Sequence, residues 1–306
     1  MAQCGLETVQ QALQTDPDVV LAGRACDTAI FATLPEMLGY DSGLALHMAK
    51  IIECTSLCCI PGGPDPILGT LEGDSFVLES MDASRVVTPM SAAAHSLYEE
   101  ADPYRIVEPD GVVTLDDVTF TAVDERRVRV TGSVFEPRPY TMKLEGAASG
   151  GFQTVMLVGI RDRHVLAHID RFLEKMHQVL GERVRAAMGD AAEGCHISLR
   201  PYGWNAVSGT PVPAGTPAPQ EIGLLFIATA RTQELATQVA KTCNPWFFHL
   251  PLEEAQELPS YGFPFSPAEL ERGQVFEFKL NHVVRVSDPM ERVRTRFVEV
   301  EETAHA

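Results

Sequence analysis

The stretch from Val107 to Gly146 restricts the fold most strongly, because apolar and polar residues alternate along several short runs. The alternation is clear in GVVTLDDVTFTAVDERRVRVTGSVF and returns in YTMKLEG. Successive side chains of a strand point to opposite faces of a sheet, so this pattern indicates half-buried strands. Polar turns such as DERR separate the runs. We therefore predict an antiparallel β meander over residues 107–146.

The chain ahead of the meander has the pattern of an α/β segment. The run Val19–Gly23 is short and continuously apolar, which is typical of a buried strand in a parallel sheet. The run from Thr88 to Tyr104 predicts a helix, because Thr88 suits the N-cap and Pro89 the first helical position. The other predicted elements are helices at Gly5–Leu13, in GRACDTAIFATLPEML after Gly23 and at Ser42–Cys54, and a strand at Ser75–Ser80.

A second region begins near SGGFQTVMLVGI. The predicted elements are strands at Thr154–Ile160, His196–Leu199, Ile222–Ala228 and Val275–Val286, and helices at His164–Leu180 and Thr232–Thr242. This order predicts a two-layer α+β sandwich that resembles the ferredoxin-like arrangement. We expect an α/β core with an antiparallel β meander in residues 1–150, followed by a smaller α+β (ferredoxin-like) two-layer region in residues 151–306.

The charge balance argues against nucleic acid and anionic lipid as partners. The chain carries 24 basic and 42 acidic residues, a net charge of −18, and no basic cluster offsets this field locally. No apolar run approaches the ~20 residues that cross a bilayer. The first residues, MAQCGLE, lack the basic and apolar parts of a signal peptide, so we expect a cytoplasmic protein with reduced cysteines.

Three of the seven cysteines crowd into IIECTSLCCIPGG, Ile51–Gly63. Cys54, Cys58 and Cys59 have the spacing C-x3-C-C, with His47 upstream as a conceivable fourth ligand. Structural zinc sites usually use two separated pairs, and no second pair follows, so we expect no metal. A thiol nucleophile would need a neighbour that lowers its pKa. The simplest interpretation is that these cysteines fill space as small buried hydrophobes.

Two short stretches offer a place for an anionic group. The pair Gly62 and Gly63 would let the backbone approach a ligand and present N–H groups, but a glycine pair between prolines also suits a plain turn. Arg24 and Asp27 follow the predicted strand Val19–Gly23, where open α/β sheets usually bind ligands. The alternative is that Asp27 caps the next helix and pairs with Arg24 on the surface.

The helix predicted from Thr88 carries candidate acid/base groups. His95, Tyr98 and Glu99 stand at i, i+3 and i+4, so they would share one helix face. An imidazole oriented by a carboxylate is suited to proton transfer near neutral pH. The alternative is a solvated acidic helix end with His95 packed in the interior.

Several motifs together resemble the acyclic terpene utilisation (AtuA) family. They are GRACD, IIECTSLCCIPGG, AAHSLYEEADPY and the pair RVRVTGS and YTMKLEGAASGGF, in this order from about Gly5 to Gly151, and more loosely LNHVVRVSDP. The sequence departs from the family in two places. The Gly- and Asn-rich α/β segment that usually comes first is missing ahead of Met1, and Lys50 replaces a histidine that usually precedes the E-C pair.

The resemblance implies catabolism of branched or acyclic carboxylic acids, plausibly as CoA thioesters, with a small companion protein in some members. We expect an enzyme that acts on a small branched carboxylate or acyl-CoA by acid/base chemistry of hydratase, lyase or isomerase type, without a cofactor, as a homo-oligomer. The alternative is a non-catalytic subunit or binding module of a multi-component complex. The candidate catalytic residues are His95, Glu99, Tyr98 and Glu53, and the candidate substrate-binding residues are Arg24, Asp27, Gly62, Gly63 and Tyr104.

Overall fold

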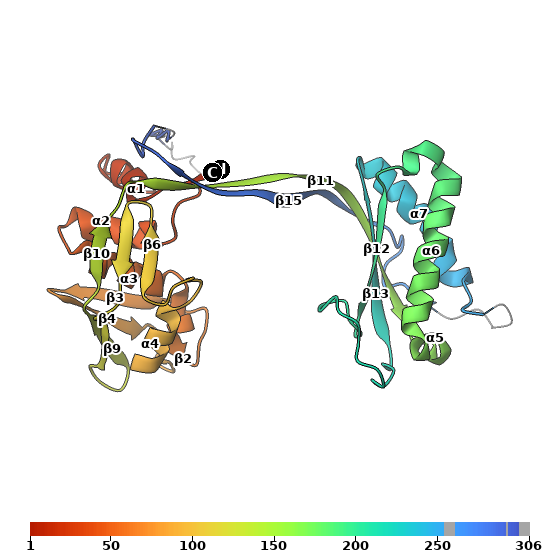
Figure 1. Cartoon of the computed structure of the whole chain (residues 1–306), viewed down its shortest axis with the longest axis horizontal. Coiled ribbons are helices and arrows are strands. Elements are labelled where there is room, and N and C mark those ends of the chain that lie inside the picture. Colours follow the sequence, from red (N-terminus) through yellow and green to blue (C-terminus); the bar gives the residue numbers. More distant parts are fainter. Residues whose placement is uncertain (254–260, 292, 300–306) are drawn as a thin grey trace, which may run out of the picture. The chain divides into compact units, whose positions relative to one another are not determined.

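The computed structural model describes residues 1–253, 261–291 and 293–299, and the chain is a mixed α/β protein with several antiparallel sheets (Figure 1). It divides into two compact units. The first comprises Met1–Gly146 and the described residues from Lys279 onward, and the second is Ala147–Phe278. Strands β11 (Thr141–Ile160) and β15 (Leu270–Arg285) pair with each other, and each runs from one unit into the other.

The first unit holds most of the short elements. Its helices are α1 Leu6–Leu13, α2 Ala29–Met37, α3 Ser42–Ile52, the 3₁₀ turn η1 Thr55–Cys58 and α4 Pro89–Ser96. Its strands, besides its parts of β11 and β15, are β1 Ala2–Gln3, β2 Cys59–Ile60, β3 Ile67–Glu72, β4 Ser75–Ser80, β5 Val86–Val87, β6 Arg105–Glu108, β7 Gly111–Thr114, β8 Thr119–Ala122, β9 Arg127–Thr131 and β10 Val134–Pro137.

Antiparallel strands do form over the predicted region, but they are divided between two sheets and are not one continuous meander. Strands β6, β7 and β10 form one antiparallel sheet in the order β10–β7–β6, while β8 and β9 join the sheet β3–β4–β9–β8. In β9 the side chains of Val128 and Val130 are buried while their neighbours are half-exposed, as the alternation predicts.

Helix α3 is the central element of the first unit. Its N-cap Asp41 accepts a hydrogen bond from the N–H of Leu44 at 3.1 Å, and apolar residues surround its axis. Every residue from Gly43 to Ile51 is buried, which is expected when a helix is covered on all sides. Two apolar clusters meet on it, one with the β3–β4–β9–β8 sheet and one with α1, α2, β6 and β7.

Two predictions for this unit are wrong. Val19–Gly23 forms no strand: its side chains are exposed, with Leu21 at 96%, and the neighbouring parallel bridge joins Cys4 to Ala25 instead. An apolar run is buried only where another element covers it, and no element of the described chain covers this one. The second is the helix from Thr88, which begins as predicted with a capping box and Pro89 but ends at Ser96, not at Tyr104.

The second unit is a two-layer α+β structure (Figure 1). Besides its parts of β11 and β15, it contains α5 Arg163–Ala167, α6 Ile169–Met188, η2 Gly189–Ala192, β12 His196–Tyr202, β13 Ile222–Ala230, α7 Gln233–His249 and β14 Tyr261–Gly262. Helices α6 and α7 cover one face of the sheet, and the core lies between these layers. Each strand and helix predicted for this region has a counterpart in the structure.

The order β11–β13–β12 is antiparallel throughout, and β14 and β15 also pair with β11. The ferredoxin-like assignment stays a prediction. The domain boundary predicted at residue 150 also stays a prediction, because compactness does not show which segments fold by themselves. Across the described residues, no helix is both long and apolar enough to span a bilayer.

Candidate functional site

The ends of two helices bring charged side chains together around Lys50. We name this group, Lys50, Glu53, His95 and Glu100, the Lys50 cluster. Lys50 Nζ lies 2.8 Å from Glu53 Oε1 and 4.0 Å from Glu100 Oε1. Lys50 and Glu53 come from the last turn of α3 and its C-cap, while Glu100 follows α4. The cluster therefore depends on how α3 and α4 dock.

A buried histidine fixes that docking. His47 of α3 is fully buried, with Nδ1 2.7 Å from Ser133 Oγ and Nε2 3.0 Å from Ser96 Oγ, the last residue of α4. Burial lowers the pKa of His47 to about 3, so the ring is neutral at pH 7. Both ring nitrogens are occupied by serines, which leaves His47 a structural group and not a neighbour that activates a cysteine.

The Lys50–Glu53 ion pair is almost fully withdrawn from water, with side-chain exposures of 9% and 6%. Burial alone lowers the pKa of Lys50, but the hydrogen bond and charge of Glu53 outweigh it, so the pKa is raised. Burial raises the pKa of Glu53, and Lys50 offsets only part of this rise. Glu53 Oε2 is buried without a hydrogen-bond partner among the described residues. This oxygen therefore has an unfilled position for a hydrogen-bond donor.

His95 provides a second unoccupied polar atom. The residue is 8% exposed, and its Nε2 also lacks a hydrogen-bond partner in the described part of the chain. Burial lowers its pKa, the charge of Lys50 lowers it further, and Glu99 opposes both. The imidazole is therefore mostly neutral at pH 7 and able to accept a proton.

Tyr98 and Glu99 reach this region in a way that differs from the prediction. Because α4 ends at Ser96, they do not share a helix face with His95, and Glu99 has a φ of +62°. The exposed ring of Tyr98 still stacks on His95, with centroids 5.5 Å apart and planes at 10°. The pKa of Tyr98 is raised, mainly by the charge of Glu99.

Arg24 is engaged in ion pairs with its own chain. Its Nη1 donates to Asp27 Oδ1 and its Nε to Glu145 Oε2, each at 2.9 Å. The pairing considered as the alternative is present, but Asp27 does not cap α2, whose N-cap is Thr28. The charge of Asp27 contributes to the raised pKa of Glu53, so Asp27 lies near enough to act on the Lys50 cluster.

The family model described as "Acyclic terpene utilisation family protein AtuA" matches residues 66–252, more than half of the chain. The chain belongs to the acyclic terpene utilisation family. No curated protein and no solved structure matched. The matched range contains the α4 end with His95, Glu99 and Glu100, whereas Arg24, Lys50 and the glycine pair precede it.

In this AtuA-family chain the loop with Gly62 and Gly63 is organised around Arg85. The guanidinium donates to the carbonyl oxygens of Pro61 and Gly62 at 2.6 and 2.8 Å, and a side chain at Gly63 would collide with it. The N–H of Gly63 donates to Ser56 O at 3.3 Å. The loop thus directs carbonyl oxygens at an arginine, and one of its two glycine N–H groups is already bonded.

The remaining candidates are Tyr104 and the three clustered cysteines. Tyr104 is 55% exposed, and its N–H donates to Asp102. Burial raises the pKa of Cys54, Cys58 and Cys59, which keeps their thiols protonated at neutral pH. Within residues 1–253, 261–291 and 293–299, no group of histidine, cysteine and carboxylate side chains has the geometry of a metal site.

Sequence reasoning missed Glu108 as well as Glu100 and the role of Lys50. Glu108 is 4% exposed and accepts hydrogen bonds from Thr28 Oγ1 at 2.9 Å and Cys26 Sγ at 3.3 Å. Burial raises its pKa to about 7. The only sequence signal is the alternation in its strand, RIVE: Glu108 stands two residues after the buried Ile106, on the face that packs inward.

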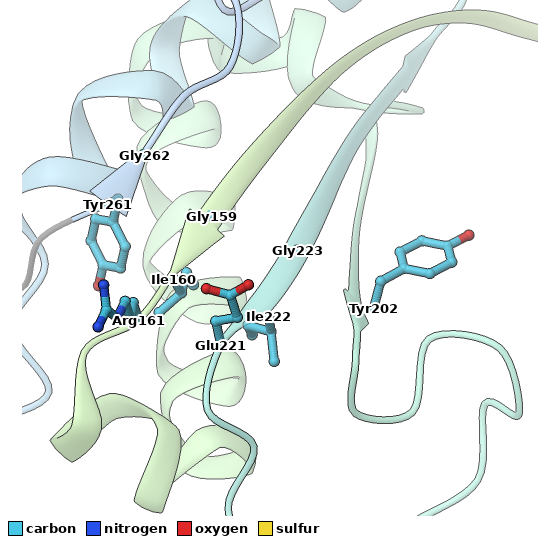
Figure 2. A pocket seen from close by; sticks show the side chains of 9 residues that line it. All are labelled: Gly159, Ile160, Arg161, Tyr202, Glu221, Ile222, Gly223, Tyr261 and Gly262. Carbon is cyan, nitrogen blue, oxygen red and sulfur yellow. The ribbon is translucent and has the colours of Figure 1, made fainter.

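The second unit has a groove at one end of its sheet, about 590 Å³ in volume (Figure 2). Gly223, Gly159 and Gly262 stand in register on three neighbouring strands, so no side chain rises from this row. Arg161 and Glu221, beside the ends of β11 and β13, line the groove with Tyr202. The groove offers a flat floor with one positive and one negative group at its edge.

Proposed function

We propose that this chain is a catabolic enzyme of the acyclic terpene utilisation family that acts on a small branched carboxylate or acyl-CoA by acid/base chemistry, of hydratase, lyase or isomerase type. The observation that carries the proposal is the Lys50 cluster. A neutral imidazole and a carboxylate of raised pKa lie beside a buried ammonium group, and each has one unoccupied polar atom.

The roles follow from charge and protonation. His95 Nε2 takes a proton from the substrate carbon next to the carbonyl, since it is neutral at pH 7. Lys50 stabilises the negative charge that then develops on the carbonyl oxygen, because an ammonium group in a poorly solvated site acts more strongly than in water. Glu53, whose raised pKa lets it take up a proton more readily than an exposed glutamate does, acts as the second acid.

The other candidates take supporting parts in this proposal. Tyr98 holds the His95 ring by stacking and can donate its hydroxyl, and Glu99 moderates the pKa of His95. Arg24 with Asp27, the Gly62–Gly63 backbone and Tyr104 form the outer part of the substrate site. We also propose that the protein is a cytoplasmic homo-oligomer with a ferredoxin-like second domain, and that it binds a small companion protein. Cell fractionation tests the location, light scattering the oligomeric state, and affinity purification the companion.

Proton abstraction can be tested before the product is known. Candidate branched acids and their CoA thioesters are incubated with the purified protein in D₂O, and deuterium incorporation is followed by mass spectrometry. We expect incorporation with the wild type and a rate at least tenfold lower in His95→Gln and in Glu53→Gln. The control His282→Gln, at an exposed histidine on β15, should exchange as fast as the wild type.

Two results would overturn the proposal. Incorporation that persists unchanged in His95→Gln would remove the proposed base. A folded wild-type chain that exchanges none of the compounds but is retained by a partner protein would favour the non-catalytic subunit instead.

A further inference from the structure

A second, smaller pocket lies between α6 and the start of β12 in the second unit. Its volume is about 260 Å³, below the ~300–1,000 Å³ of pockets that take drug-sized ligands. The pocket therefore suits one small chemical group. The lining residues that determine its chemistry are His177, Gly181 and Arg185 of α6, and Cys195 and His196 at the start of β12.

The lining of this pocket has the opposite charge to the chain as a whole. Acidic residues outnumber basic ones by 42 to 24 in the sequence, yet the side chains around the pocket include Arg185, His177 and His196 and no carboxylate. Within the described residues none of these three side chains forms an ion pair or hydrogen bond. The positive charge of Arg231 also acts on Cys195, whose pKa it lowers against the larger, raising effect of burial.

The geometry of α6 places these groups on one side. His177, Gly181 and Arg185 stand at i, i+4 and i+8, on one face of the helix. A Cβ atom built on Gly181 would lie 3.5 Å from Arg185 Nη1, so the guanidinium lies over the glycine. Glycine thus leaves open the space between Arg185, one turn after it, and His177, one turn before it.

We propose that this pocket binds the phosphate group of a small molecule. A guanidinium matches the oxygens of phosphate with two parallel N–H donors, and two imidazoles can add donors around the same group. A phosphate dianion gains more from this positive lining than a singly charged ligand does, because it carries two negative charges. Among the described residues, no acidic side chain lines the pocket to oppose it. The site is separate from the Lys50 cluster, and its assignment does not depend on the reaction proposed there.

Cys195 supplies a reporter inside the pocket, and Cys54 a matched control. Both thiols are partly exposed, but burial and then the charge of Glu53 raise the pKa of Cys54, whereas Arg231 acts on Cys195 in the opposite direction. Alkylation by anionic iodoacetate and by neutral iodoacetamide is measured at each thiol by peptide mass spectrometry. The ratio of the two rates cancels the thiolate fraction and reports the local potential.

We expect the iodoacetate to iodoacetamide ratio to be at least fivefold higher at Cys195 than at Cys54. Inorganic phosphate, at constant ionic strength, should slow alkylation of Cys195 only. Arg185→Gln should lower the ratio at Cys195 and abolish its protection by phosphate, whereas Arg171→Gln, at an exposed arginine of α6 that pairs with Glu253, should change neither. Equal ratios at the two thiols, or no protection by phosphate, would overturn the proposal.

Calorimetry on the full chain distinguishes the two sources of phosphate. Inorganic phosphate and adenosine 3′,5′-bisphosphate are titrated at constant ionic strength, and tighter binding of the bisphosphate identifies a phosphate ester as the natural ligand. Equal affinity identifies the free ion. In either case Arg185→Gln and His196→Gln should weaken binding at least tenfold, and affinity that is unchanged in both variants contradicts the site.

Discussion

Lys50 Nζ donates to Glu53 Oε1 at 2.8 Å in a place where neither side chain is more than 9% exposed. Such a pair has lost most of its hydration, so each charge depends on the other. The pair is thus a chemical feature and a structural constraint at once, since neither residue can be neutralised alone without leaving an uncompensated charge.

Replacing Lys50 should therefore destabilise the fold strongly. We expect Lys50→Met to cost about 3–5 kcal/mol in the free energy of unfolding, and Lys50→Met with Glu53→Gln to recover part of it. The control is Arg127→Met, which breaks the exposed Arg127–Asp124 pair and should destabilise the fold far less, because water screens an exposed pair. Urea denaturation measures all three. A cost for Lys50→Met no larger than for Arg127→Met would contradict the burial of the pair.

The titration of His95 should report the charges around it. The charge of Lys50 lowers the pKa of His95 and the charge of Glu99 raises it. We expect Lys50→Gln to raise this pKa and Glu99→Gln, at an exposed position, to lower it, as followed by NMR of the imidazole. Shifts of the same sign in both variants would rule out this arrangement of charges.

Glu108 should make the protein less stable as the pH rises. Its pKa is about 7 in the folded chain and 4.5 when unperturbed, so the folded state holds the proton more tightly. The cost of ionising it is absent below about pH 4.5, grows as the pH rises, and is complete above about pH 7, where it reaches roughly 3 kcal/mol. Glu108→Gln should remove this cost.

Thermal melts of the wild type and Glu108→Gln from pH 4.5 to pH 8 provide the measurement. The melting temperature of the variant should increase relative to that of the wild type as the pH rises. The comparison also cancels His47, whose lowered pKa makes stability fall as the pH drops from 6.5 toward 3. A stability difference that does not vary with pH would show that Glu108 ionises normally.

Two helical glycines should respond to alanine in opposite directions. A Cβ at Gly43 of α3 would lie 2.8 Å from Phe135 N and from Ser133 O, both backbone atoms, so we expect Gly43→Ala to cost about 1–3 kcal/mol. At Gly181 of α6 the nearest atom is the end of Arg185 at 3.5 Å, and alanine should gain about 0.5–1 kcal/mol. The midpoints of urea denaturation of the two variants, compared with that of the wild type, measure both changes. A stabilising Gly43→Ala would mean that α3 is less tightly covered.

The sequence predicted those elements whose signals are local. Thr88 and Pro89 mark the start of α4, and alternation marks β9, because capping and strand burial depend on neighbouring residues. The end of α4 was not predictable in this way. Glu99 adopts a positive φ that its residue type does not favour, and tertiary packing determines such a position.

The candidate site was only partly accessible from the sequence for the same reason. Glu53 and His95 were chosen for their chemical type, but the residue whose charge acts on both is Lys50, which sequence reasoning treated as a departure from the family. A buried lysine has no sequence signal, because its burial depends on carboxylates from other parts of the chain, here Glu100 after α4. The strand predicted at Val19–Gly23 is the opposite case: its residue types favour burial, but no described element covers it.

Helix α3 carries both His47, which the core encloses, and Lys50, one turn later. A single inserted or deleted residue between Asp41 and His47 would rotate both by about 100° and remove His47 from Ser96 and Ser133, and Lys50 from Glu100. Evolution of this helix is therefore restricted to substitutions: its length cannot drift as loop lengths do, and a change in the chemistry of the cluster must arise within the existing register.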